Sequence, residues 1–436
     1  MSDNKNSYYF VWFRVLFNAR FYYPIFTVFF LDHGLSLEQF ALLNTVWAVS
    51  IVLLEVPSGA LADIVGRKRL VVGASCLMLL EMLCLLLVPP HSQWVFWIFA
   101  LNRILSGAAE ASASGADEAL AYDSLPEEGR EKLWAQIMAK TMRWQAVGFV
   151  LAMVLGGVFY DAEVLNQFIQ NLGLNFNVSK TLSMKLPILL CVFSSLACIF
   201  VSLKMKDTLK TTSLKLSECF NAGKEAFSTT LKAGGWILRS KHVFSILMFA
   251  LVIDSVIRMF MTLNSEYYRS LGFTEASFGV IGACMGLMGF VVPSVGEWIA
   301  SFASRKKVAL LLVILTSIGL WGVQASFVKP MLFFAFLLSA TMSLLGYFSS
   351  LYLNKEAPAK MRATVLSFKG LSFNLAYGSL GILYSLLVAQ IRGDSQSGQV
   401  FEGALSYFAP FFLLSVVFAF GLSFWQRRFL GKKGAD

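Results

Sequence analysis

The chain has 436 residues, of which 57% are hydrophobic and only 14% are charged, and its mean hydropathy is +0.66. A soluble globular domain has about 25% charged residues, so this composition excludes one and indicates a chain whose solvent is lipid. The formal net charge of +10 does not indicate a nucleic-acid partner, because the basic residues gather in the termini and in the loops of one side, as the positive-inside rule describes.

Apolar runs of about 20 residues without a period-2 alternation predict membrane-spanning helices and not a barrel. The chain is therefore expected to be an all-α integral membrane protein with twelve transmembrane helices in two six-helix bundles. An even number of spans with basic loops on one side places both termini in the cytoplasm. The expected spans are 9–31, 38–58, 70–90, 93–116, 136–160, 186–204, 242–263, 276–297, 307–327, 330–352, 363–390 and 404–427.

The longest internal loop divides the spans six and six. The expected domains are an N-terminal bundle at 1–204, a cytoplasmic linker at 205–241, and a C-terminal bundle at 242–436 that ends in a short cytoplasmic tail. The linker mixes Leu and Phe with Lys, which is typical of a helix lying on an anionic membrane surface.

Several kinds of chemistry have no pattern in this sequence. The six cysteines form no C-x-x-C motif and the three histidines stand at span ends, so we expect no metal site. We find no Walker A loop and no Ser–His–Asp arrangement. The protein is therefore expected to use no cofactor and not to be an enzyme.

The segment 55–69 stands between two apolar runs and contains an acid, a proline, small residues and a basic triplet. We interpret it as a tight loop in which Asp63 and Arg67 offer charge-assisted hydrogen bonds to neighbouring helix ends. The segment 296–307 repeats it after the eighth span, with Ser301 in place of the acid. Such parallel repeats predict a substrate site at the interface of the two halves.

Gly59, Leu61, Asp63, Gly66, Arg67 and Lys68 resemble the G-x-L-a-D-x-x-G-R-[RK] loop of the major facilitator superfamily, and the chain is identified as a member of its bacterial drug-efflux-like branch. The resemblance implies a secondary active transporter that works by alternating access and is driven by a proton gradient. It also implies that Asp63 and Arg67 act in a cytoplasmic gate. The full set that we expect at this gate is Glu55, Gly59, Asp63, Gly66, Arg67, Lys68, Asp117 and Asp123.

Ionisable residues within spans are costly and are functional candidates for that reason. Arg103 and Gly107 resemble the family's R-x-x-q-G pattern, whose arginine is tied to proton coupling, and Glu110 lies two turns further along the same helix. Asp254 is one turn from Arg258, so these two charges either neutralise each other or form a proton-switched site. The expected coupling candidates are Arg103, Glu110, Asp254 and Glu81.

A second group of residues is expected to line the substrate cavity, because each is polar or aromatic and near the middle of a span or beside a polar candidate. For Arg20 the alternative of a salt bridge to a neighbouring span stays open. The fifth span matches the superfamily's exporters at Gly148, Gly156 and Gly157, but has Ala152–Met153 where they have Gly-Pro. The cavity candidates are Arg20, Tyr23, Trp47, Arg143, Trp144, Arg258 and Asn374.

The leading hypothesis is proton-coupled export of small amphipathic or drug-like organic compounds by a monomer in a bacterial inner membrane, with the lipid bilayer and a small-molecule substrate as its partners. One alternative is proton-coupled uptake of an organic anion, such as a siderophore or a carboxylate, because arginines outnumber acids in the predicted spans. A further alternative is a receptor or scaffold that has lost transport.

Overall fold

The computed structural model describes residues 5–207, 224, 228, 231–232, 234–358, 361–394 and 400–429. Every regular element within these ranges is a helix. Most of the expected linker 205–241, the end of the expected tail, and the side chain of Asp63 lie outside the described part of the chain.

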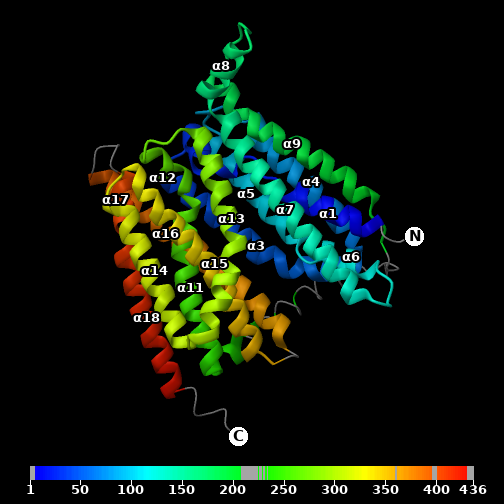
Figure 1. Ribbon diagram of the computed structural model, residues 1–436, viewed down its shortest axis with the longest axis vertical. Coiled ribbons are helices and arrows are strands. Elements are labelled where there is room, and N and C mark those ends of the chain that lie inside the picture. Colours follow the sequence, from blue (N-terminus) through cyan, green and yellow to red (C-terminus); the bar gives the residue numbers. More distant parts are fainter. Residues whose placement is uncertain are drawn as a thin grey trace. The chain divides into compact units, whose positions relative to one another are not determined.

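Among the described residues, the first half of the chain forms ten elements, labelled in Figure 1 where there is room. They are α1 (Lys5–Asn18), η1 (Tyr23–Ile25), α2 (Phe26–Asp32), α3 (Leu37–Val65), α4 (Arg67–Leu87), α5 (Val95–Ala113), α6 (Ala116–Asp123), α7 (Arg130–Tyr160), α8 (Ala162–Asn171) and, closing this half, α9 (Lys180–Lys204). The second half contains α11 (Lys241–Thr262), α12 (Asn264–Ser270), α13 (Glu275–Phe302), α14 (Arg305–Ala325), η2 (Lys329–Met331), α15 (Leu332–Glu356), α16 (Arg362–Asp394), α17 (Val400–Ser406) and α18 (Phe408–Phe429).

Ten helical segments are long and apolar enough to cross a membrane, counted over the described residues. The expected spans 9–31 and 93–116 are not among them. The first of these two contains a break between α1 and η1, and the second contains α5 and the beginning of α6. The prediction of an all-helical membrane protein agrees with the ten candidates, and the count of twelve spans stays a prediction.

The break in the first span follows from its sequence. Pro24 stands in the first turn of η1, and a proline disfavours helical backbone in the residue before it and cannot donate a hydrogen bond. At the other side of the break, the Asn18 side chain donates to the carbonyl of Arg14 at 2.8 Å. Arg20 therefore lies on an irregular segment, between two pieces of helix.

The segment 55–69 is not a loop, and that expectation was wrong. α3 continues through Pro57 to Val65 and α4 begins at Arg67, so Gly66 alone separates them. The run after Pro57 is rich in Ala and Leu, which favour a helix, and a membrane helix tolerates a proline when its neighbours satisfy the freed carbonyl. Gly66 ends α3 because its φ of +99° is readily accessible only to glycine.

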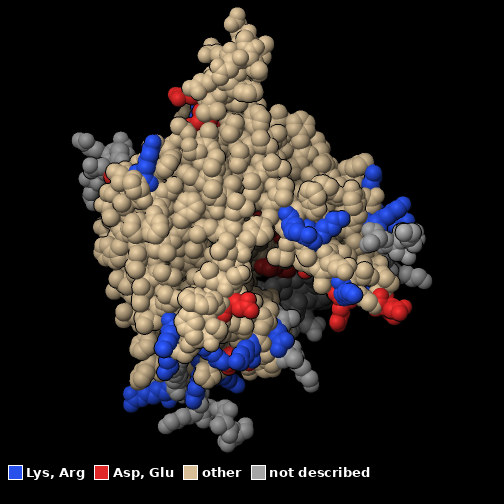
Figure 2. Space-filling model, viewed as in Figure 1, with Lys and Arg blue, Asp and Glu red and all other residues tan. Residues whose placement is uncertain are grey.

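The contacts divide the chain into two units. The first consists of Met1–Ser36, Val46–Ala226 and Thr274–Gly286, and the second of Leu37–Thr45, Phe227–Phe273 and Leu287–Asp436. The beginning of α3 thus groups with the second unit and the beginning of α13 with the first, whereas the expected boundaries at 204 and 242 place each with the other half. Each unit has an end at which α4 or α14 begins, and we call this end the basic end. In Figure 2 most of the visible Lys and Arg side chains around α14 and α18 lie at the lower end, and a further basic side chain is visible near the upper end.

Two neighbouring glycines of α7 allow close packing within the first unit. A Cβ added at Gly156 would overlap the carbonyl of Phe21, in the break of the first span, and a Cβ at Gly157 would lie 2.8 Å from the backbone nitrogen of Gly279 on α13. Both neighbours are backbone atoms, which cannot move aside as a flexible side chain does. The fit of α7 against the broken segment therefore depends on these two positions.

We predict that Gly156→Ala destabilises the protein by about 1–3 kcal/mol, because overpacking at a backbone contact forces the helices apart. The midpoint of thermal unfolding in detergent should fall accordingly. Gly73→Ala is the matched control: Gly73 is also in a helix, but a Cβ there would meet nothing within 4 Å. If both substitutions shift the midpoint equally, the close contact at Gly156 is not important for stability.

Candidate functional site

The first unit contains a cavity of about 210 Å³ at the level of the break in the first span. Most of its wall is polar or charged. One side comes from α1 and the break, and the other from the end of α5 and the beginning of α6. The lining residues are Arg14, Phe17, Asn18, Arg20, Tyr23, Glu110, Ala113, Ser114 and Asp117.

Irregular backbone on both sides forms this cavity. α1 ends at Asn18, so the chain carries Arg20 away from the helix axis. On the opposite wall α5 ends at Ala113, and Gly115 has a φ of +75° that turns the chain into α6. Irregular backbone within a membrane protein is tolerated where it lines a cavity or is buried in protein.

Arg14 is held at one end of the cavity by two acids of α6. Its Nε lies 2.5 Å from Asp117 Oδ2, and its Nη2 lies 2.5 Å from Glu118 Oε1. The Asp117 side chain is almost completely buried and follows the expected span 93–116. Burial raises the pKa of this carboxyl to about 6, while the Arg14 charge opposes the shift.

Arg20 and Glu81 form an ion pair that is buried on both sides. Arg20 is 3% exposed and Glu81 is fully buried, and Arg20 Nη1 donates to Glu81 Oε1. The guanidinium also lies over the Phe17 ring, 5.2 Å from its centroid. Of the two roles open for Arg20, the geometry corresponds to the salt bridge with a neighbouring span.

A chain of hydrogen bonds continues from this pair to Arg103. Asn102 donates to the backbone carbonyl of Glu81 at 2.7 Å, and its side-chain oxygen accepts from Arg103 Nε at 2.9 Å and Nη2 at 2.7 Å. Arg103 also donates to the Tyr22 hydroxyl at 3.4 Å. The sequence reasoning did not assign a role to Asn102, although an amide beside an arginine within an apolar run was a signal.

Arg103 has no carboxylate within ion-pair distance among the residues that the structure describes. Its guanidinium instead lies over the Phe26 and Phe30 rings, at 5.1 and 5.3 Å. Glu110, which we expected to act together with Arg103, lines the cavity beside Arg14 and Arg20. No ion pair joins Glu110 to a cation within the described part of the first unit, so its carboxylate is available to a ligand or a proton.

The second unit contains a separate polar cluster on α11 and α16. Arg258 pairs with Asp254 at 2.8 Å and donates to the Asn374 side-chain oxygen at 3.0 Å. Tyr377 and Thr262, which the sequence reasoning did not select, are 3.0 Å apart at their hydroxyls. The Asp254–Arg258 contact corresponds to the self-neutralising alternative, and Asn374 joins it.

The remaining cavity candidates do not converge on a cluster in the described structure. Trp47 is partly buried on α3, whereas Arg143 and Trp144 are exposed on α7. Arg143 Nε donates to the carbonyl of Ala139, one turn earlier in its own helix.

Of the expected gate residues, Arg67, Lys68 and Asp123 lie at the basic end of the first unit, whereas Asp117 lines the polar cavity. Arg67 pairs with Asp123, which joins the beginning of α4 to the end of α6, and the backbone nitrogen of Lys68 is 3.4 Å from Asp207 Oδ2. Glu55 is partly buried on α3. Gly59 and Asp63 are helical positions of α3, with the Asp63 side chain outside the described residues.

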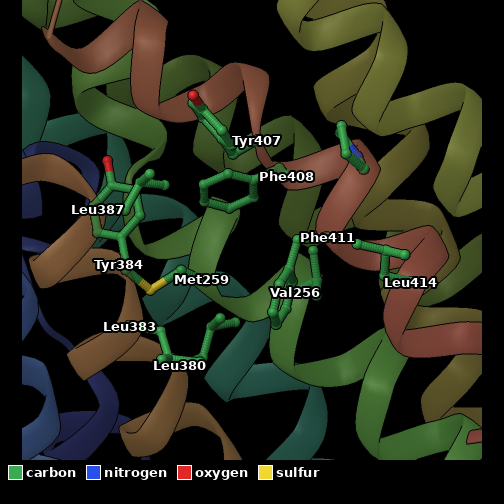
Figure 3. Close-up of a pocket in the computed structure, with 11 residues that line it drawn as sticks. Val256, Met259, Leu380, Leu383, Tyr384, Leu387, Tyr407, Phe408, Phe411 and Leu414 are labelled. Carbon is green, nitrogen blue, oxygen red and sulfur yellow. The ribbon is translucent and has the colours of Figure 1, made fainter. Parts of the chain in front are cut away.

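An apolar groove of about 340 Å³ lies between α11, α16 and α18 of the second unit. Figure 3 shows the side chains of Val256, Met259, Leu383, Phe408 and Leu414 around it. It has no charged lining residue, so it contains no carboxylate for which a substrate and a proton could compete. The polar cavity of the first unit is the better candidate site.

Known proteins resemble this chain in sequence over half of its length and in structure over nearly all of it. The family model described as Major Facilitator Superfamily matches residues 9–231. A bacterial homologue of the human lysosomal transporter Spinster is 14% identical, with a TM-score of 0.68 and 98% of each chain covered. The nucleoside transporter NupG is 11% identical, with a TM-score of 0.69 and coverage of 97% of this chain and 98% of its own.

A D-xylose–proton symporter is 14% identical, with a TM-score of 0.63 and coverage of 94% of this chain and 96% of its own. At these identities the likeness to the solved structures shows the fold. No curated protein matches the sequence.

We predict that Glu81→Gln destabilises the protein by about 3–5 kcal/mol, because it leaves the Arg20 charge buried without a counter-charge. Thermal unfolding in detergent measures the loss. The double variant Arg20→Met with Glu81→Leu should recover most of it. Glu275→Gln is the control, since its ion pair with Lys180 is partly exposed and is worth about 1 kcal/mol or less. Equal shifts for Glu81→Gln and Glu275→Gln would show that burial does not make the Arg20 pair special.

Proposed function

The chain belongs to the major facilitator superfamily, and we propose on that basis that this multi-pass membrane transporter exports small amphipathic or drug-like organic compounds in exchange for protons. The observation that carries the proposal is the charge state of the polar cavity. Its two arginines, Arg14 and Arg20, are each paired with an acid. Glu110 is the cavity acid without an ion pair in the described structure.

A cavity with neutralised arginines and one unpaired carboxylate favours a cationic or neutral substrate over an anionic one. An amphipathic cation would place its charge at Glu110 and its apolar part against Phe17 and Tyr23, which also line the cavity. A proton competes for the same carboxylate, because two positive charges cannot share it without a large cost in a low-dielectric site. Exchange of one for the other couples transport to the proton gradient without a cofactor.

The proposal includes an orientation. The basic end of each unit faces the cytoplasm by the positive-inside rule, in the inner membrane of a bacterium, and the Arg67–Asp123 contact belongs to a cytoplasmic gate. One copy of the chain contains all the residues that this mechanism uses, so we propose that the transporter works as a monomer.

One observation favours a second candidate function, proton-coupled uptake of an organic anion. Arg103 is a buried cation without a carboxylate partner in the described part of the chain, and neutral groups alone hold it. An anion that reached Arg103 would find a charge to pair with. Access is the difficulty, since Arg103 is 4% exposed and is not among the residues lining the cavity.

We predict that Glu110→Gln reduces the proton efflux that a lipophilic cation evokes by at least 10-fold. The measurement uses purified protein in liposomes with an internal pH dye, to which tetraphenylphosphonium, a neutral dye or citrate is added across an imposed proton gradient. Glu118→Gln is the matched control, because Glu118 already pairs with Arg14 and its side chain is 44% exposed. It should retain most of the wild-type response.

Binding gives a second readout of the same residue. The wild-type affinity for tetraphenylphosphonium should rise with pH, since a proton must leave Glu110 before the cation binds, and Glu110→Gln should bind weakly at every pH. A response to citrate and to no other compound would contradict the export proposal and support uptake of an organic anion. Cation-evoked flux that is unchanged in Glu110→Gln would contradict the role of this carboxylate.

A further inference from the structure

A cavity of about 690 Å³ opens at the basic end of the second unit, between α11, α14 and α15. It shares no residue with the Asp254–Arg258 cluster, and it lies outside the site proposed for transport. Its volume is in the range of ligand pockets, about 300–1,000 Å³. The cavity has two distinct parts, a charged mouth and an apolar interior.

Charged side chains gather at the mouth, on the ends of the three helices. His242 is at the beginning of α11, Arg305 and Lys306 are at the beginning of α14, and Glu356 is at the end of α15. Arg305 pairs with Glu356 at 2.6 Å and lies over the Tyr352 ring, 5.6 Å from its centroid. Lys306 is exposed, so the mouth has a net positive charge.

The interior is apolar, and its few polar groups already have partners in the protein. Ser245 donates to the carbonyl of Lys241 at 3.0 Å, and Ser349 accepts from Lys369 at 2.8 Å. An occupant therefore need not supply hydrogen bonds there. The rest of the interior wall consists mainly of aliphatic and aromatic side chains, among them Phe249, Ile253, Leu312, Leu345 and Phe348.

The corresponding space of the first unit is filled. There residues of α1, α4 and α5 belong to one buried cluster, to which α6 and α9 also contribute; it includes Phe10, Phe13, Val71, Ala74 and Ala109. α4 begins with Arg67 and α14 with Arg305, so the two sets of helices occupy equivalent places in the repeat. Since the first unit packs this space with side chains, the fold does not require a cavity there.

We propose that this cavity binds an anionic phospholipid of the surrounding bilayer, with the phosphate at Arg305 and Lys306 and one acyl chain inside. The charged mouth lies where the helices begin and end, which is the depth of lipid headgroups, and basic pockets at such depths bind anionic headgroups. The apolar interior then continues in the direction that an acyl chain takes.

The test compares two lipids that differ in headgroup charge alone. Purified protein in a neutral detergent is titrated with dioleoyl phosphatidylglycerol or dioleoyl phosphatidylcholine, and bound lipid is counted by native mass spectrometry. We expect at least 5-fold tighter binding of phosphatidylglycerol. Lys306→Ala should remove this preference, whereas Lys307→Ala, the exposed neighbour that does not line the cavity, should retain it.

Two further variants test the mouth and the interior separately. Glu356→Gln frees Arg305 from its acid and should strengthen phosphatidylglycerol binding by about 2-fold or more. Local unfolding of the mouth would weaken binding, so a gain in affinity excludes that explanation. Ala309→Phe narrows the interior and should weaken the binding of both lipids. The proposal fails if Lys306→Ala and Lys307→Ala bind phosphatidylglycerol equally. It also fails if free glycerol phosphate at millimolar concentration displaces the lipid, since the acyl chain would then contribute nothing to the affinity.

Discussion

The ion pair between Arg20 and Glu81 is the interaction on which the described site of the first unit depends. Two charges without water are stable only when each has its counter-charge and its hydrogen bonds, and Arg20 reaches Glu81 because the first span is broken between Asn18 and Tyr23. The same break exposes Tyr23 to the cavity and brings Phe21 against Gly156 of α7. Asn102 then joins the backbone of Glu81 to Arg103.

This arrangement separates charges that hold the structure from charges that are available to a ligand. Arg14, Arg20 and Arg258 each have an acidic partner, which removes most of the excess of arginines that the sequence suggested. Glu110 and Arg103 form no ion pair within the described part of the first unit. They lie on one helix, yet Glu110 lines the cavity and Arg103 is enclosed by aromatic rings. Position on a helix does not by itself determine which charge a substrate can meet.

The sequence predicted the class of fold, because runs of apolar residues report directly on the lipid environment. It predicted the candidates of the site less well. Opposite charges in different spans, such as Arg20 and Glu81, can be suspected of pairing, but no spacing rule identifies partners 61 residues apart. The segment 55–69 was wrongly predicted to be a loop from its proline, its small residues and its charges. Pro57 continues α3, and Gly66 ends it with a positive φ. The charged and apolar cavity of the second unit had no sequence signal, since the apolar side chains that line it are of the same kinds as those of a packed core.

The broken first span also bears on how the protein is made. An insertion machinery that tests each segment as it emerges meets 9–31 as a short helix, a break and a shorter helix. Arg20, at mid-membrane depth, adds about 2.5–3.5 kcal/mol to the cost of insertion, and Arg14, nearer the end of the span, adds less. The acids that compensate these charges, Glu81 and Asp117, are synthesised later. The first span therefore becomes stable in the bilayer only after α4 and α6 have followed it, so its stability depends on helices that are inserted later.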